Sequence, residues 1–237
     1  MAIAENINKI EEEIQKTCDK TGRKRGEITL MGVSKFEPVE KLEQAFNAGI
    51  HCFGESRVKE AAEKLADFKE NHPEARIHLI GSLQRNKAKQ AALFFDCIQS
   101  VDREELVAEL EKHSCLRNEP LSVLFELHTG EESKSGFAVN NDADFNTLFK
   151  TVELVLNCEK LKPAGVMTMA PYTTDTSLIR ASFRQLVKAR KELEKRFPKI
   201  ENGGSWEVLS MGMSNDYKIA IEEGSTLLRV GSAIFKE

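Results

Sequence analysis

The chain has 237 residues, of which 41% are hydrophobic and 30% charged, a balance typical of a soluble globular protein. Its formal net charge of −4 argues against a general nucleic-acid-binding protein, which would carry a basic stripe, and its richest basic cluster, at residues 23–25, is short. No apolar run approaches the roughly 20 residues needed to span a bilayer, and four glutamates interrupt the first twenty residues, so we expect neither a membrane span nor a secretory signal.

The cysteines and histidines are scattered. Five cysteines form no CxxC pair, and five histidines show no HxxxH or HxH spacing. An odd, unclustered set of thiols without an export signal is typical of reduced cysteines in the cytoplasm. The histidine spacing predicts no zinc site. We therefore expect a cytoplasmic protein without a bound metal.

Helical and extended patterns alternate along the chain. Residues 3–19 are predicted to form a helix, because isoleucines recur at steps of three or four and make one apolar stripe. Eight predicted strands follow, at residues 28–34, 51–53, 77–80, 97–100, 121–127, 164–169, 207–210 and 226–230. The helices predicted between them cover residues 38–48, 56–70, 87–95, 102–113, 142–156, 176–196 and 216–222, with Asp102 as the N-cap of the fourth of these.

The strand–helix repeat indicates the fold class. Short apolar strands without polar alternation belong to a parallel sheet that is covered on both sides. Eight such units most simply close as a (β/α)8 TIM barrel, preceded here by an extra N-terminal helix. An open doubly wound sheet is the alternative. Because no linker rich in Pro, Gly or Ser divides the chain, we expect one domain over residues 1–237.

Lys35 ends the first predicted strand. A lysine taken at random from a βα loop is an ordinary surface residue. In a barrel, however, the carboxyl end of the first strand opens into the active-site mouth. Partial burial of the amine there would favour formation of a Schiff base.

Two later loops offer groups suited to binding phosphate. They supply hydroxyls, small residues and backbone N–H groups, from Ser210, Gly212, Met213 and Ser214 after the seventh strand and from Gly231 and Ser232 after the eighth. Phosphate sites in barrels recur after these two strands. Asp216 would repel a phosphate, so we expect it to turn away as a helix cap. An amine and a phosphate site together are what a protein needs to hold pyridoxal 5′-phosphate (PLP).

Arg229 interrupts the apolar eighth strand. A guanidinium inside a barrel is costly unless a polar or anionic group meets it, so Arg229 is either part of a structural ion pair or a contact to a cofactor. Residues 56–59 match the SxxK pattern of serine acylases but lack the companion motifs, and the chain has no P-loop and no GxGxxG. A barrel whose phosphate site holds a sugar phosphate remains an alternative.

The chain resembles the YggS/PROSC family of PLP homeostasis proteins, which is related in fold to the N-terminal barrel of alanine racemase. The matching segments are residues 32–35 with Pro38, 53–55, 78–81, 83–84, 86–87, 133–136, 165–169, 209–214 and 228–235. The resemblance implies a fold-type III PLP-binding barrel in which Lys35 carries PLP as a Schiff base. It also implies that the loops at residues 210–214 and 231–232 hold the phosphate and that Arg229 faces the pyridine nitrogen.

The chain departs from the family pattern at four positions. Ser56 and Arg57 replace the usual Asn-Tyr, Ser82 replaces a proline, and His128 stands where an asparagine is common. These residues are expected to border the mouth, so the departures bear on the ring contacts and on any partner surface.

The resemblance also bears on whether the protein is an enzyme. Alanine racemase uses its PLP lysine and a tyrosine from a second, C-terminal domain, which we do not expect here, and neither tyrosine of this chain lies in a matching segment. Arginine at the pyridine nitrogen disfavours protonation of the ring and weakens it as an electron sink. We therefore expect a cytoplasmic monomer, without catalytic residues, that binds PLP, buffers it and delivers it to apo PLP-dependent enzymes. The alternative is a small monomeric PLP-dependent racemase or decarboxylase.

Overall fold

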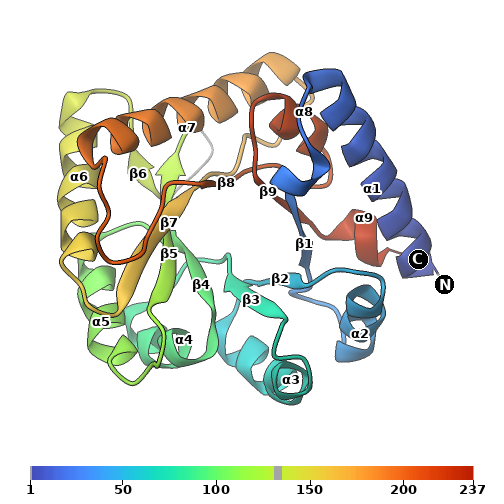
Figure 1. The fold of residues 1–237 in the computed structure, drawn as a ribbon, viewed down its shortest axis with the longest axis horizontal. Helices are drawn as coiled ribbons and strands as arrows, with labels where there is room; N and C mark the ends of the chain where they lie inside the picture. Colours follow the sequence, from blue (N-terminus) through green and yellow to red (C-terminus); the bar gives the residue numbers. More distant parts are fainter. Residues whose placement is uncertain (1, 131–134, 237) are drawn as a thin grey trace.

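The computed structural model describes residues 2–130 and 135–236, and the strands in this part of the chain close into a barrel (Figure 1). The strands are β1 (Thr29–Val33), β2 (Cys52–Glu55), β3 (Arg76–Leu79), β4 (Cys97–Val101), β5 (Leu121–His128), β7 (Leu161–Met167), β8 (Val208–Ser210) and β9 (Leu227–Val230). Each pairs in parallel with its neighbour in this order, and β9 pairs with β1. The predicted (β/α)8 barrel is therefore confirmed, and the open doubly wound sheet is wrong.

Helices surround the strands. They are α1 (Ala2–Thr21), α2 (Val39–Asn47), α3 (Val58–Asn71), α4 (Ala88–Phe94), α5 (Glu104–Ser114), α6 (Asp142–Leu156), α7 (Thr176–Arg196), α8 (Tyr217–Glu222) and α9 (Ser232–Phe235). The predicted N-terminal helix and the predicted alternation are confirmed. No helix among the described residues is long and apolar enough to cross a membrane. Nor do these residues bring together a group of three or more side chains able to hold a metal ion.

Two local predictions are corrected. The short strand β6 (Phe137–Ala138) pairs with the end of β5 and was not predicted, because two residues carry no readable periodicity. Asp102 is not the N-cap of α5. That place belongs to Arg103, whose guanidinium bonds the Asp102 carboxylate, so the expected cap is used for an ion pair instead.

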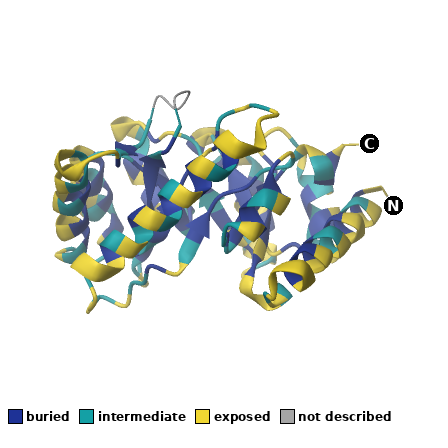
Figure 2. Cartoon of the chain, turned by 90° about the horizontal axis from the view of Figure 1, so that it is seen from above, coloured by how far each residue is buried: buried dark blue, intermediate teal, exposed yellow. Residues whose placement is uncertain are grey.

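The apolar core has an outer and an inner part. The larger cluster joins the helices to the outer face of the barrel, with residues such as Ile14 of α1 and Phe183 of α7 fully buried. Two smaller clusters of buried residues belong to strands alone and fill part of the inside, made of Met31, Cys52 and Leu227 and of Cys97, Leu124 and Met167. Figure 2 shows the buried strands behind and between helices whose outward sides are exposed. Buried polar side chains, among them Gln99, Ser210 and Arg229, also lie inside the barrel.

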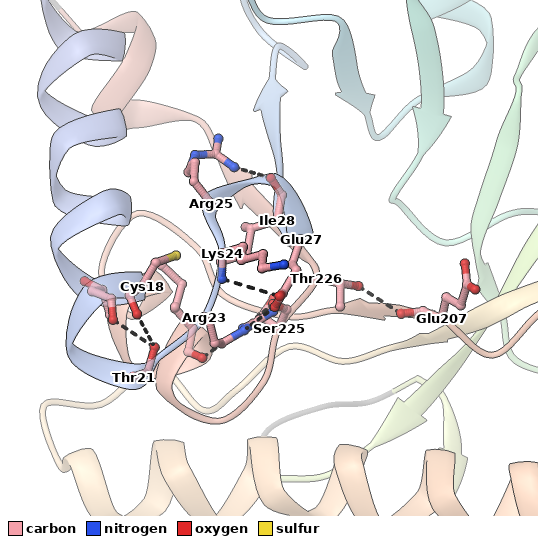
Figure 3. A network of polar contacts seen from close by, with 12 residues as sticks. Cys18, Thr21, Arg23, Lys24, Arg25, Glu27, Ile28, Glu207, Ser225 and Thr226 are labelled. Carbon is pink, nitrogen blue, oxygen red and sulfur yellow. Dashed lines mark hydrogen bonds and ion pairs between the residues drawn. The ribbon is translucent and has the colours of Figure 1, made fainter.

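Helix α1 packs against the last elements of the chain, and the two termini lie side by side (Figure 1). Asn6 donates hydrogen bonds to the carbonyls of Ile234 and Lys236, at 3.1 and 2.9 Å. After the helix, Arg23 donates to the carbonyls of Ile221 and Ser225, at 3.0 and 2.8 Å, in the network drawn in Figure 3. The extra helix thereby supports α8 and α9, the helices that follow the two predicted phosphate loops.

Candidate functional site

A cavity of about 680 Å³ opens at the carboxyl ends of the strands. Its lining includes residues at or just after the ends of several strands, among them Val33 of β1, Ile80 after β3, Met167 of β7 and Arg229 of β9. Carboxyl ends of barrel strands are where active sites of this architecture lie. The cavity is therefore the candidate site, and it can be built up residue by residue.

Lys35 lies at the edge of this cavity, in a turn after β1. The turn is closed by a hydrogen bond of 2.9 Å from the N–H of Glu37 to the carbonyl of Ser34. The side chain of Lys35 is exposed, and its Nζ lies 5.4 Å from the centre of the Phe36 ring. The expected partial burial of Lys35 is therefore wrong, because the turn carries the side chain beyond the end of the strand.

The loops after β8 and β9 meet on the same cavity. Met213, Ser214, Gly231 and Ser232 line it, and the hydroxyl oxygens of Ser214 and Ser232 lie 3.2 Å apart. The N–H of Ala233 also approaches the Ser214 hydroxyl, at 3.5 Å. Hydroxyl and N–H donors from two loops are thus gathered in one place, where they can surround an anion.

Ser210 and Gly212 do not line the cavity. Ser210 is fully buried and its hydroxyl bonds the side chains of Gln99 and Arg229. Gly212 has a φ of +97°, and a Cβ there would lie only 2.5 Å from the Cβ of Ala220. A glycine is therefore required for the path of the loop. Both residues shape the site from behind, whereas the other six predicted residues reach the cavity.

Arg229 is buried, and its guanidinium donates to the Ser210 hydroxyl at 2.6 Å and to the Thr168 carbonyl at 2.7 Å. Burial lowers the pKa of Arg229 to about 10, a shift that the carboxyls of Asp216 and Glu126 oppose. The side chain therefore stays charged at neutral pH. A fixed positive charge lies at the inner end of the cavity.

The sequence predicted that Asp216 would turn away from the site, but it does not. It precedes α8, but its carboxylate accepts a hydrogen bond of 2.5 Å from the N–H of Met213, and the residue lines the cavity. Burial raises the pKa of Asp216. Asp216 does occupy the predicted N-cap position of α8, but its carboxyl makes no capping bond and instead fixes the loop after β8.

Glu126 is a lining residue that sequence reasoning missed. It is buried near the end of β5 and accepts a hydrogen bond of 2.7 Å from the Ser135 hydroxyl. Burial raises the pKa of this carboxyl, against the opposing effects of Ser135 and Arg229. The signal was present, because a glutamate interrupts the apolar strand at residues 121–127 just as Arg229 interrupts the last one.

Behind Arg229, a row of hydrogen bonds crosses the inside of the barrel. Because an arginine side chain can only donate hydrogen bonds, the Ser210 hydroxyl accepts one from Arg229. The same hydroxyl donates a hydrogen bond to Gln99 Oε1, at 2.6 Å. The Gln99 amide then donates to His78 Nδ1, at 2.9 Å. Burial lowers the pKa of His78 to about 4, so the imidazole is neutral at pH 7 and Nδ1 is free to accept. Each group in the row therefore donates to the next, from Arg229 through Ser210 and Gln99 to His78.

The departures from the family pattern lie in different places. Ser56 and Ser82 line the cavity. Arg57 does not line the cavity; it pairs with Glu60 at 2.7 Å, and its guanidinium lies 5.9 Å from the centre of the Phe36 ring. His128 is half-buried and is not part of the lining. Of the matching segment at residues 133–136, the first two residues lie outside the described part of the chain.

Comparison with known proteins agrees with this architecture. Residues 2–237 match the family model of the alanine racemase N-terminal domain. A protein of Vibrio cholerae named pyridoxal phosphate homeostasis protein is 37% identical over 239 residues, which cover 100% of this chain and 96% of that one. The solved structure of PipY from Synechococcus elongatus with PLP bound has a TM-score of 0.82 at 29% identity, over 98% of this chain and 99% of PipY. An alanine racemase of Clostridium difficile, at 12% identity, shares the fold alone, with a TM-score of 0.75 over 100% of this chain and 60% of the racemase.

The lowered pKa of His78 predicts a pH dependence of stability. Between about pH 6.5 and 4 the unfolded chain binds a proton that folded His78 does not, so the free energy of unfolding should fall as the pH falls through this window. His78→Asn retains an acceptor for Gln99 but removes the titration, and should flatten the dependence by roughly 1–3 kcal/mol. Urea unfolding at several pH values measures it, with His113→Asn as the control. Equal pH profiles for the unaltered protein and His78→Asn would contradict the assignment.

Proposed function

The chain belongs to the family of pyridoxal phosphate homeostasis proteins, and from that premise we propose that it binds PLP in the cavity at the mouth of its barrel. The observation that carries the proposal is the meeting, in one cavity, of the Lys35 amine with the hydroxyls of Ser214 and Ser232. In this role the protein holds PLP covalently but reversibly, buffers its concentration and delivers it to apo PLP-dependent enzymes.

The residues present fit this cofactor. PLP when bound supplies an aldehyde that reacts reversibly with a primary amine. Lys35 would provide that amine, adding to the aldehyde carbon and forming a carbon–nitrogen double bond with loss of one water. Ser214, Ser232 and the backbone at Gly231 would donate hydrogen bonds to the phosphate. Arg229 would meet the pyridine nitrogen from the inside of the barrel.

Arg229 also supports binding without efficient turnover. Its guanidinium is held by Ser210 and Thr168 and stays charged at neutral pH. A fixed positive charge beside the pyridine nitrogen opposes protonation of the ring, so a carbanion on a bound amino acid would be poorly stabilised. A protein that only stores and delivers PLP needs the reversible link to Lys35 and no stabilised carbanion, and a charged Arg229 is compatible with that link.

We further propose that the protein acts as a single-domain monomer in the cytoplasm. The cavity takes its amine, its hydroxyls and its arginine from one chain, so the site does not call for a second subunit. All five cysteines carry free thiols, which suits a reducing compartment.

A second candidate function is amino-acid racemisation or decarboxylation. The observation that favours it is Glu126, a carboxyl in the cavity whose pKa is raised by burial and which is therefore suited to proton transfer. A racemase needs an acid or base on each face of the substrate carbon, and Lys35 and Glu126 are two titratable groups on one cavity.

Lys35 is predicted to be the sole covalent attachment point. Borohydride reduction of the PLP-bound protein followed by peptide mass mapping should place the pyridoxyl group on the peptide that contains Lys35. Lys35→Ala should abolish this labelling, while Lys59→Ala, at an exposed position on α3, should leave it unchanged. Label on Lys59 or Lys134 in the unaltered protein would refute the assignment.

The hydroxyls of Ser214 and Ser232 are predicted to contribute much of the affinity. A hydrogen bond to a charged phosphate contributes roughly 1.5–3 kcal/mol. Ser214→Ala or Ser232→Ala should therefore raise the Kd for PLP about tenfold or more. Fluorescence titration measures the change, and pyridoxal, which lacks the phosphate, should bind poorly to the unaltered protein. Equal affinity for pyridoxal and PLP would mean that these loops do not bind the phosphate.

Deuterium exchange separates the two candidate functions. The PLP-bound protein incubated with L-alanine in deuterated water should exchange the Cα proton no faster than free PLP does, because Arg229 keeps the ring a poor electron sink. Exchange at the roughly 1–10³ s⁻¹ typical of enzymes would make the racemase the better proposal. In that case Glu126→Gln should slow the exchange, which identifies the second base.

A further inference from the structure

The turn that carries Lys35 is tied to its surroundings at both ends. Lys35 and Phe36 are its two central residues, between Ser34 and Glu37, whose backbone groups close it. The N–H of Ser34 donates to the carbonyl of Gly54 in β2, at 3.0 Å. These contacts hold the backbone of the turn, although the side chains of Lys35 and Phe36 are exposed.

Lys64, on the neighbouring helix α3, reaches both ends of the turn. Its Nζ donates to the carbonyl of Ser34 at 2.9 Å and to that of Glu37 at 3.1 Å. A third bond, of 2.6 Å, goes to the carboxylate of Glu55. An ammonium group has three N–H donors, and Lys64 uses all three. Lys64 therefore holds the turn and is not available to react with an aldehyde.

Glu55 fixes Lys64 in this place. It lies at the end of β2, only 1% exposed, and also accepts a hydrogen bond of 2.7 Å from the Ser34 hydroxyl. A buried carboxylate is costly unless a cation and hydrogen-bond donors meet it, and Lys64 and Ser34 supply both. The ammonium, the carboxylate and the turn thus form one unit, which we call the Lys64 clamp (Ser34, Glu37, Glu55 and Lys64).

We propose that Lys64 is the positioning residue for Lys35, holding the turn so that the Lys35 amine stays at the cavity edge. This inference rests on the proposed function. Four rotatable bonds already let the exposed side chain of Lys35 move, and a loose turn would multiply the positions that its amine visits. Each added freedom must be lost when the covalent link forms, so the link becomes weaker. The clamp removes that freedom in advance.

Two ligands separate positioning from a general structural role. PLP reacts with the Lys35 amine, whereas pyridoxine 5′-phosphate carries an alcohol in place of the aldehyde and binds through its ring and phosphate alone. Lys64→Met should raise the Kd for PLP roughly tenfold, because it removes the two hydrogen bonds that hold the backbone of the turn carrying Lys35. The Kd for pyridoxine 5′-phosphate should change little. Equal losses for the two ligands, or no loss for either, would overturn the proposal.

Matched variants complete the experiment. Lys59→Met makes the same change at an exposed position on the same helix, where the lysine pairs with Glu63 at 3.7 Å, and should alter neither Kd. If Lys64→Met does not fold, the double variant Glu55→Gln with Lys64→Met avoids the unpaired buried carboxylate and should give the same selective loss. Lys64→Arg retains the charge and the donors, and should recover most of the affinity for PLP.

The variant Lys35→Ala distinguishes failure of the clamp from failure of the proposed function. It should bind PLP only as weakly as the unaltered protein binds pyridoxine 5′-phosphate. If Lys35→Ala retained full affinity for PLP, the proposed covalent link would be wrong whatever Lys64 does. If Lys35→Ala loses affinity and Lys64→Met does not, the link stands and the clamp is wrong.

Discussion

Arg229 places a positive charge inside the barrel, and the polar interior follows from the need to satisfy it. A guanidinium taken out of water requires acceptors on every side that protein covers. Ser210 and the Thr168 carbonyl supply two, and the carboxyls of Glu126 and Asp216 oppose the cost of burial. Apolar residues could fill the same space, as Met31 and Leu227 do nearby. At Arg229, however, the position faces the cavity and holds a buried charge instead of an apolar side chain.

The site divides into a rigid floor and a reachable rim. The floor is built on strands, where ladder hydrogen bonds and the row from Arg229 to His78 fix each side chain. The rim is built on turns, and there the backbone is held by a few specific bonds, as between Met213 and Asp216 or between Ser34 and Lys64. Rim and floor are nevertheless linked through Asp216, whose carboxyl holds the Met213 N–H and also opposes the lowering of the Arg229 pKa.

The sequence predicted the barrel because that prediction depends on local pattern. Short apolar strands and amphipathic helices are visible one segment at a time, and so was the isoleucine stripe of α1. The residues around the cavity were found where a motif or an interruption marked them, as with Lys35 and Arg229. Gln99 and Lys64 were missed because their partners lie far away in the chain, Ser210 being 111 positions from Gln99 and Ser34 30 positions from Lys64. Only the closed barrel brings them together.

The two errors about side-chain direction have one physical origin. Lys35 was expected to be partly buried and Asp216 to turn outward, because each was judged by its distance from a strand or helix end. Turn geometry decided otherwise, since Lys35 follows β1 into an exposed turn and Asp216 folds back onto the N–H of Met213. The exposure of Lys35 matters for function. An enzyme gains from closing water out around its reacting amine, whereas a carrier must let its covalent link be reached and exchanged. For the proposed carrier, an exposed amine on a backbone held fixed would meet the second requirement, because the link would form with little loss of freedom and still be open to attack.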